Sequence, residues 1–168
     1  WSSGSIYNAY DDAYSSVPDN SYYVLTDENQ IYICLQQGRD ADGAASQSTI
    51  KPTGTGLIPF STSDGYVWKY LYSLTGANSS RYLSGNFIPL EKINDSATSP
   101  SLSALEQLQA SIQEAASSGQ IVGVKIKEGG TGYTSAPTVT INGDGAGAAA
   151  TATVSGGNPI SGATYNYN

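Results

Sequence analysis

Histidine and methionine are absent from this chain of 168 residues, and cysteine occurs once, as Cys34. Without histidine there is no imidazole to act as a general base, to complete a Ser-His-Asp triad or to ligate a metal. A single thiol can form neither an intrachain disulfide nor a thiolate metal cluster. These absences exclude the most common kinds of catalytic and metal site.

Charge is also scarce, because charged residues make up 12% of the chain against about a quarter of a typical soluble domain. Seven Lys and Arg against fourteen Asp and Glu give a formal net charge of −7, which argues against binding to nucleic-acid phosphates. No apolar run approaches the roughly 18 residues that a membrane-spanning helix needs. We therefore expect neither a nucleic acid nor a membrane as partner.

Small polar residues and tyrosine take the place of charge. The chain has 19 Gly and 13 Tyr, and Ser and Thr are also abundant. This composition is typical of strands and turns, and it suits large protein–protein contacts, in which Tyr supplies area and a polar tip. A hydrophobic content of 39% is enough for a packed core. The composition therefore favours a β-rich protein that packs against neighbours.

Two strand patterns dominate the first half of the chain. Residues 22–25 and 30–35 predict the strands of a hairpin, joined by the polar turn at residues 26–29. Residues 66–74 give the strongest strand pattern, with large apolar groups on both faces, and we expect this strand to be covered on both sides. Its alternation places three aromatic residues on one face, and with Tyr66 they form the predicted aromatic core: Tyr66, Trp68, Tyr70 and Tyr72.

An amphipathic helix is predicted over residues 101–118. Apolar side chains recur there at intervals of three and four residues, and this stripe is expected to pack on the sheet: Leu102, Leu105, Leu108 and Ile112. Ser103 and Glu106 have the spacing of a capping box. Between the strand and this helix, residues 76–100 are mixed, with one short apolar segment at 87–90. The fold class predicted is mainly β (α+β), with antiparallel, β-sandwich-like sheets and this one helix.

The first 21 residues allow two interpretations. Tyr7, Tyr10 and Tyr14 have the spacing of one helical face, but the same polar segment could form an extended arm. In either case, these three tyrosines are the predicted partner-binding surface.

The last third of the chain is rich in Gly, and we place a boundary near residue 100, which divides the chain into regions 1–100 and 101–168. Strands are predicted at 121–126, 138–141 and 150–154. The Asn142-Gly143 pair favours a hairpin turn between the last two.

No cluster of residues predicts a reaction. Asp40 and Asp42 begin like a calcium-binding EF-hand loop, but Ala44, Ala45 and Lys51 stand where that loop needs an Asp or Asn, a Gly and a Glu. Paired carboxylates lie in turns, and a glycosidase would need two of them to converge on one cleft. We therefore assign no catalytic, cofactor-binding or metal-binding residue.

Three motifs within residues 22–75 occur in one order that is known from a protein family. They are Tyr32-Ile33-Cys34-Leu35, then Lys51-Pro52-Thr53-Gly54-Thr55-Gly56, then Thr62-Ser63-Asp64-Gly65-Tyr66-Val67-Trp68-Lys69-Tyr70-Leu71-Tyr72. Together they resemble a block of T4-like bacteriophage baseplate wedge subunits, most of all the homodimeric wedge protein in its cyanophage version. A second segment, Gly129-Gly130-Thr131-Gly132-Tyr133 with residues 136–141, is similar to a hairpin module of phage tail and virion proteins.

The resemblance implies a structural component of a contractile tail baseplate, without enzymatic activity, located in the virion and assembled in the host cytoplasm. Its partners would be other baseplate or tail proteins, and it would form a homo-oligomer. The resemblance covers about a third of the chain, and because a complete wedge subunit would be longer than 168 residues, we expect the chain to be an internal portion of a longer protein. Three alternatives stay open: a carbohydrate- or receptor-binding β module of a tail fibre or adhesin, a glycosidase with paired carboxylates, and a β-rich fragment without an assignable role.

Overall fold

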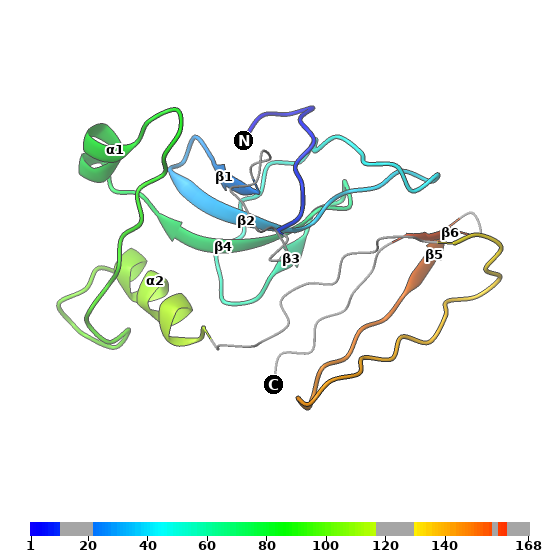
Figure 1. Cartoon of the computed structure of the whole chain (residues 1–168). Coiled ribbons are helices and arrows are strands. Elements are labelled where there is room, and N and C mark those ends of the chain that lie inside the picture. Colours follow the sequence, from blue (N-terminus) through cyan, green and yellow to red (C-terminus); the bar gives the residue numbers. More distant parts are fainter. Residues whose placement is uncertain (11–21, 117–129, 156–157, 161–168) are drawn as a thin grey trace.

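The computed structural model describes residues 1–10, 22–116, 130–155 and 158–160 (Figure 1). The main sheet has four antiparallel strands in the order β1-β2-β4-β3. Its strands are β1 (Tyr23–Leu25), β2 (Gln30–Gln36), β3 (Phe60–Ser61) and β4 (Val67–Ser73); the other elements are α1 (Gly76–Tyr82), α2 (Ala104–Glu114), β5 (Thr153–Ser155) and β6 (Asn158–Ile160). The predicted class, mainly β (α+β) with antiparallel pairing, is confirmed, and the described residues contain two helices where one was predicted.

Strands β1 and β2 form the predicted hairpin. Its turn is closed by the Thr26 N–H, which donates to the Gln30 carbonyl at 2.9 Å, and by the Asn29 N–H, which donates to the Thr26 carbonyl at 3.0 Å. Asn29 has a φ of 59°, and Asn tolerates this left-handed conformation better than most residues do. The polar turn residues thus account for the hairpin locally.

Strand β4 does not keep its alternation, and this corrects the predicted placement of Tyr72. Tyr70 pairs with Tyr32, but Tyr72 pairs with Ile31, so that Leu71 is an extra residue in a β-bulge. Because Ile31 and Tyr32 are neighbours in β2, they point to opposite faces. Tyr72 therefore lies on the face opposite to Tyr70, and only Trp68 and Tyr70 share the face that was predicted for all three.

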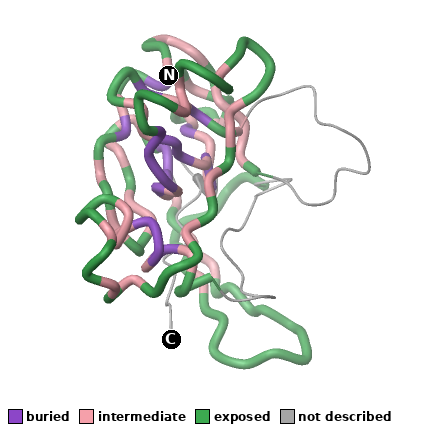
Figure 2. Tube along the Cα trace, turned by 90° about the vertical axis from the view of Figure 1, so that its left-hand side faces the viewer, coloured by how far each residue is buried: buried purple, intermediate pink, exposed green. Residues whose placement is uncertain are grey.

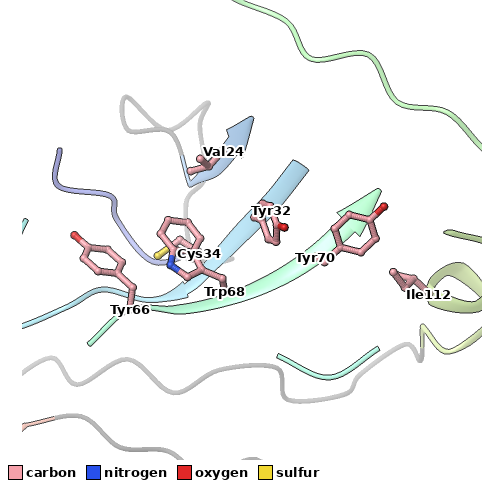
Figure 3. Packing of buried hydrophobic residues seen from close by; sticks show 7 residues of the cluster. All are labelled: Val24, Tyr32, Cys34, Tyr66, Trp68, Tyr70 and Ile112. Carbon is pink, nitrogen blue, oxygen red and sulfur yellow. The ribbon is translucent and has the colours of Figure 1, made fainter. Parts of the chain in front are cut away.

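A hydrophobic cluster covers each face of the sheet, as expected for this strand pattern. The larger cluster is shown in Figure 3 and contains Val24, Tyr32, Cys34, Tyr66, Trp68, Tyr70 and Ile112. The smaller one contains Ile31, Tyr72 and Leu74. The buried residues concentrate on the sheet, as Figure 2 shows, whereas the segments around it are mostly half-buried or exposed. The burial of several large aromatic side chains is the main source of stability in such a core.

Helix α2 begins and ends inside the predicted range. Its capping box is present, because the Ser103 hydroxyl accepts the Glu106 N–H at 3.3 Å and the Glu106 carboxylate accepts the Ser103 N–H at 2.8 Å. This box places the first helical residue at Ala104, and Leu102 therefore precedes the helix. No helix in the described part of the chain is long and apolar enough to cross a membrane.

The part of α2 that packs on the sheet begins at Leu108. Ile112 joins the larger cluster and Leu108 packs against it from a half-buried position. Leu105 is 43% exposed, so its assignment to the core was wrong, and Leu102 is half-buried. The reason is position along the axis, since the first turn lies beyond the buried stretch that contains Gln109, Ala110 and Ile112.

The Gly-rich region pairs differently from the prediction. Residues 138–141 form no strand, and the observed hairpin joins β5 to β6, with Thr153 opposite Ile160. Val139 and Ile141 are exposed, so a hairpin at Asn142-Gly143 would gain little from apolar burial, and an isolated two-stranded hairpin is marginal in water. The predicted strand at 121–126 lies outside the described residues.

Candidate interaction surface

The predicted core aromatics are buried. Tyr66, Trp68 and Tyr70 have no exposed surface and Tyr72 is 8% exposed. The rings of Tyr66 and Trp68 are stacked, with centroids 5.5 Å apart and an angle of 14°. The Tyr66 hydroxyl donates to the Ser46 carbonyl at 2.7 Å. These side chains hold the sheet to its flanking loop and are not available to a partner.

Tyr7 belongs to the rim of this core, which corrects its assignment to an exposed partner surface. Its ring meets Trp68 edge to face, with centroids 5.6 Å apart and an angle of 71°, and its N–H donates to the Tyr66 hydroxyl at 3.2 Å. The segment 1–10 contains no helix. Its Gly4 N–H donates to the Ser48 carbonyl at 2.8 Å, and this tether along the loop directs Tyr7 inward.

The other two predicted partner residues do not form a common surface with Tyr7. Tyr10 is 38% exposed and packs edge to face on Tyr22, with centroids 5.0 Å apart. Tyr14 lies outside the described residues. Tyr10 is therefore the one member of the set that the structure places at the surface.

Asp64 organises the turn that enters β4. One carboxylate oxygen accepts the backbone N–H groups of Thr49 at 2.8 Å and Ile50 at 2.9 Å and the Ser48 hydroxyl at 3.2 Å, and the other accepts the Thr62 hydroxyl. Partial burial acts to raise the pKa of Asp64, but the four hydrogen bonds outweigh it and the pKa lies below its ordinary value. The carboxylate thus joins two loops and serves the fold.

The Lys-Pro-Thr-Gly-Thr-Gly motif is also structural. Pro52 is fully buried, and a Cβ on Gly54 would approach the Phe60 ring to 2.9 Å, so that a larger residue would displace the ring. Lys51 forms exposed salt bridges with Asp27, at 2.8 Å, and Glu28. The residues that carry the family resemblance therefore build the sheet and its loops.

The Asp40 loop is closed by hydrogen bonds within the chain. An Asp40 carboxylate oxygen accepts the N–H groups of Asp42 at 3.1 Å and Ala44 at 2.9 Å. This is an Asx-type turn, so Asp40 has a local structural role. The described residues contain no cluster of three acidic, Cys or His side chains that could hold a metal ion.

The loop after α1 carries the two most exposed large apolar side chains of the described residues, and the exposed Tyr82, the last residue of α1, precedes it. Leu90 is 82% exposed, Phe87 is 73% exposed and Tyr82 is 60% exposed. We call residues 82–90 the apolar loop. Exposed apolar side chains that gather on one segment, unlike scattered ones, are typical of an interaction site.

Hydrogen bonds at both ends hold the apolar loop. The Ser84 N–H donates to the Phe87 carbonyl at 3.1 Å, and the Ser84 hydroxyl accepts the Phe87 N–H at 3.2 Å. The Tyr72 hydroxyl donates to the Pro89 carbonyl at 2.9 Å. Beyond the loop, the Gln109 side chain donates to the Glu91 carbonyl at 3.0 Å. The exposed side chains are therefore presented from a fixed backbone, supported by β4 and α2.

Two cations flank the apolar loop. Arg81 and Lys92 are exposed, and their side chains have no hydrogen-bond or ion-pair partner in the part of the chain that the structure describes. By contrast, Arg39 donates to the Gly43 carbonyl at 2.6 Å and Lys69 to the Leu57 carbonyl at 3.1 Å. Two unpaired positive charges beside apolar side chains, in a chain of net charge −7, would suit a partner surface with acidic groups at its rim.

Sequence reasoning missed this surface, although it noted the apolar segment 87–90. The segment has neither the alternation of a strand nor the period of a helix; Gly85 precedes it and Pro89 interrupts it. The one available signal was a short apolar run between Arg81 and Lys92. Whether such a run is buried depends on its neighbours in space, which no local pattern contains.

Comparisons of the chain with models of protein families, with curated proteins and with solved structures gave no match.

Proposed function

We propose that this protein is a structural component of a contractile phage tail baseplate and that it contacts its neighbours through the apolar loop. The observation that carries the proposal is the exposure of Phe87 and Leu90 on a loop fixed by hydrogen bonds. The virion context comes from the resemblance of residues 22–75 to baseplate wedge subunits. Partners would be other baseplate or tail proteins, and the chain would form a homo-oligomer in the virion.

Physical reasons support a contact role for the loop. Aromatic and large aliphatic side chains supply most of the binding energy at protein interfaces when water is excluded around them. A loop that is already ordered loses little conformational entropy on binding. Arg81 and Lys92 at its ends can select the orientation of a partner through charge. Such a site holds proteins together and needs no catalytic group.

The test is assembly with the products of the genes that surround this one. The tagged full chain is co-expressed with each neighbouring sheath, tube and wedge gene product, and complexes are isolated and identified. We expect at least one specific complex that is lost in the double variant Phe87→Ser/Leu90→Ser. The matched control is Ile58→Ser, which changes a side chain that is 66% exposed outside the apolar loop and should leave the complex intact.

Two results would contradict the proposal. A gene neighbourhood without sheath, tube and wedge genes would remove the baseplate context. A complex that persists in the double variant, or that Ile58→Ser disrupts equally, would show that the apolar loop is not the contact surface.

A carbohydrate-binding module is the second candidate, supported by a different surface. Tyr10 and Tyr23 are partly exposed and both pack on Tyr22, with ring centroids 5.0 and 4.8 Å apart. Clustered tyrosines can stack on sugar rings. A glycan array would show binding that soluble sugar competes for and that Tyr23→Ala abolishes, without any complex with tail proteins. An array without such binding would rule this candidate out.

A further inference from the structure

The exposed segment 130–150 contains the chain's single Asn-Gly pair, Asn142-Gly143. All residues of this segment are exposed except Pro137 and Ala150, which are half-buried. Gly143 is surrounded by open space, because a Cβ placed on it would meet no atom within 4 Å. No hydrogen bond within the described part of the chain engages the Asn142 side chain or the Gly143 N–H.

We propose that Asn142 is a site of spontaneous deamidation, by which the folded protein acquires a negative charge in this segment. The reaction requires the backbone nitrogen of the next residue to reach the side-chain carboxamide carbon. Glycine favours this approach because it has no Cβ to block it and its backbone is the most flexible. Asparagine is among the residues that limit the lifetime of proteins at high temperature, and exposure of the backbone decides which asparagines react.

The chemistry needs only water. The Gly143 backbone nitrogen loses its proton to solvent and attacks Cγ of Asn142, which forms a C–N bond. The bond from Cγ to Nδ2 then breaks, and Nδ2 takes up a proton and departs as ammonia. The product is a five-membered succinimide ring. Water opens the ring at one of its two carbonyl carbons, which leaves either an ordinary aspartate or its isomer with the main chain running through Cβ. In total, one water is consumed and one ammonia is released.

Two Asp-Gly pairs provide a contrast within the same chain, whereas a third, Asp144-Gly145, lies in the same exposed segment as Asn142-Gly143. At Asp64-Gly65 the carboxylate accepts four hydrogen bonds, and the Gly65 N–H donates to the Thr62 carbonyl at 3.0 Å. The Gly43 N–H of Asp42-Gly43 donates to the Asp40 carbonyl at 3.1 Å. In both pairs the attacking nitrogen is engaged, so tertiary structure protects them. Asn142-Gly143 has no such protection.

The product would change the local charge. Asp144 is the one charged residue between residues 130 and 154, so deamidation adds a second carboxylate two residues away on this Gly-rich segment. The net charge of the whole chain changes from −7 by one further negative unit. The protein is therefore expected to become more acidic with age at this one position.

The experiment is incubation of the full folded chain at mildly alkaline pH, followed by peptide mapping with tandem mass spectrometry and an assay of isoaspartate. We expect the mass change of deamidation at Asn142 before any at Asn86 or Asn94, together with isoaspartate at the same position. Gly143→Val should abolish most of the conversion without loss of the fold, which circular dichroism would verify, because the segment is exposed. Equal conversion at Asn142, Asn86 and Asn94 would overturn the proposal, as would an unchanged rate in Gly143→Val.

A second measurement separates the effect of the fold from that of the sequence. When the chain is unfolded in urea, isoaspartate formation should begin at Asp64-Gly65, which the folded structure protects, whereas the rate at Asn142 should change little. A large increase in the rate at Asn142 on unfolding would show that the folded segment restrains it and would contradict the proposal.

Discussion

Tyr70 and Tyr72 lie two residues apart in β4, yet their side chains belong to opposite faces of the sheet. The bulge at Leu71 reverses the alternation between them. The Tyr70 hydroxyl is hydrogen-bonded to the buried Ser73 hydroxyl at 2.8 Å, and the Tyr72 hydroxyl donates to the Pro89 carbonyl at 2.9 Å. The bulge thus gives one strand both a core contact and a support for the apolar loop.

The two tyrosines provide a matched pair of variants. Tyr70→Phe and Tyr72→Phe should each lower the free energy of unfolding by about 1 kcal/mol, the usual net value of one hydrogen bond. Only Tyr72→Phe should also increase amide hydrogen exchange in residues 84–92, because it removes the bond to Pro89. Equal exchange in the two variants would show that this hydroxyl does not hold the loop.

Asp64 should make stability depend on acid pH. Its pKa in the folded protein lies below the ordinary value of 3.8, so folding favours the ionised form. The stabilisation by Asp64 is present at pH values above the ordinary pKa of 3.8. It is lost as the pH falls through the pKa that Asp64 has in the folded protein. Asp64→Asn should therefore be less stable than the native chain at neutral pH.

The difference in the free energy of unfolding between the native chain and Asp64→Asn should become smaller as the pH is lowered. Urea unfolding across the acid pH range measures it. The pKa values of Asp27 and Glu106 are also lowered, by hydrogen bonds with Lys51 and Ser103 respectively. These two carboxylates are present in both proteins, so the comparison isolates Asp64. A difference that stays constant with pH would contradict this assignment.

Alkaline pH should destabilise the fold through Cys34 and Tyr32. Burial raises the pKa of the Cys34 thiol from 9.0 to about 12 and that of Tyr32 from 10.0 to about 12. Folding therefore favours the protonated forms, and their contribution to stability is lost as the pH rises from the ordinary pKa values through the folded ones. At neutral pH, a thiol reagent should label Cys34 only after unfolding. Rapid labelling of the folded chain would show that the thiol is accessible.

Ile112 and Leu105 test the two halves of α2. Ile112 is 8% exposed and packs in the larger cluster, whereas Leu105 is 43% exposed. Ile112→Ala should lower the free energy of unfolding by about 2–5 kcal/mol, the range for truncation of a buried aliphatic side chain to Ala. The free energy of unfolding of Leu105→Ala should stay within about 0.5 kcal/mol of that of the native chain, as is usual for surface positions. Thermal unfolding of both variants measures the contrast, and similar losses would mean that the first turn also packs on the sheet.

Local patterns predicted the elements whose signals lie within a few residues. The hairpin of β1 and β2 follows from the polar turn at 26–29, and α2 follows from its capping box and apolar period. The predicted aromatic core is buried for the same reason, since a strand with large apolar side chains on both faces is stable when both faces are covered. Helix α1, a single short segment capped by Thr75, had no such period and was not predicted.

The candidate site was less predictable, because its residues depend on contacts between distant segments. Tyr7 shares a spacing with Tyr10 and Tyr14, but its packing depends on Trp68, which is far away in sequence. In the apolar loop, Leu83 and Ile88 pack against the smaller cluster, whereas Phe87 and Leu90 stay exposed. No periodicity distinguishes an apolar run that is buried from one that is not.

The sequence by itself determined the absence of histidine chemistry, the β-rich class and the main strands and helix, because composition and short-range pattern suffice for these. Only the tertiary structure decided which face each aromatic residue takes, where the carboxylate of Asp64 acts and which apolar residues stay exposed. These properties arise from register, bulges and long-range packing. Such interactions join residues far apart in the chain, so their free energy is not contained in any single segment.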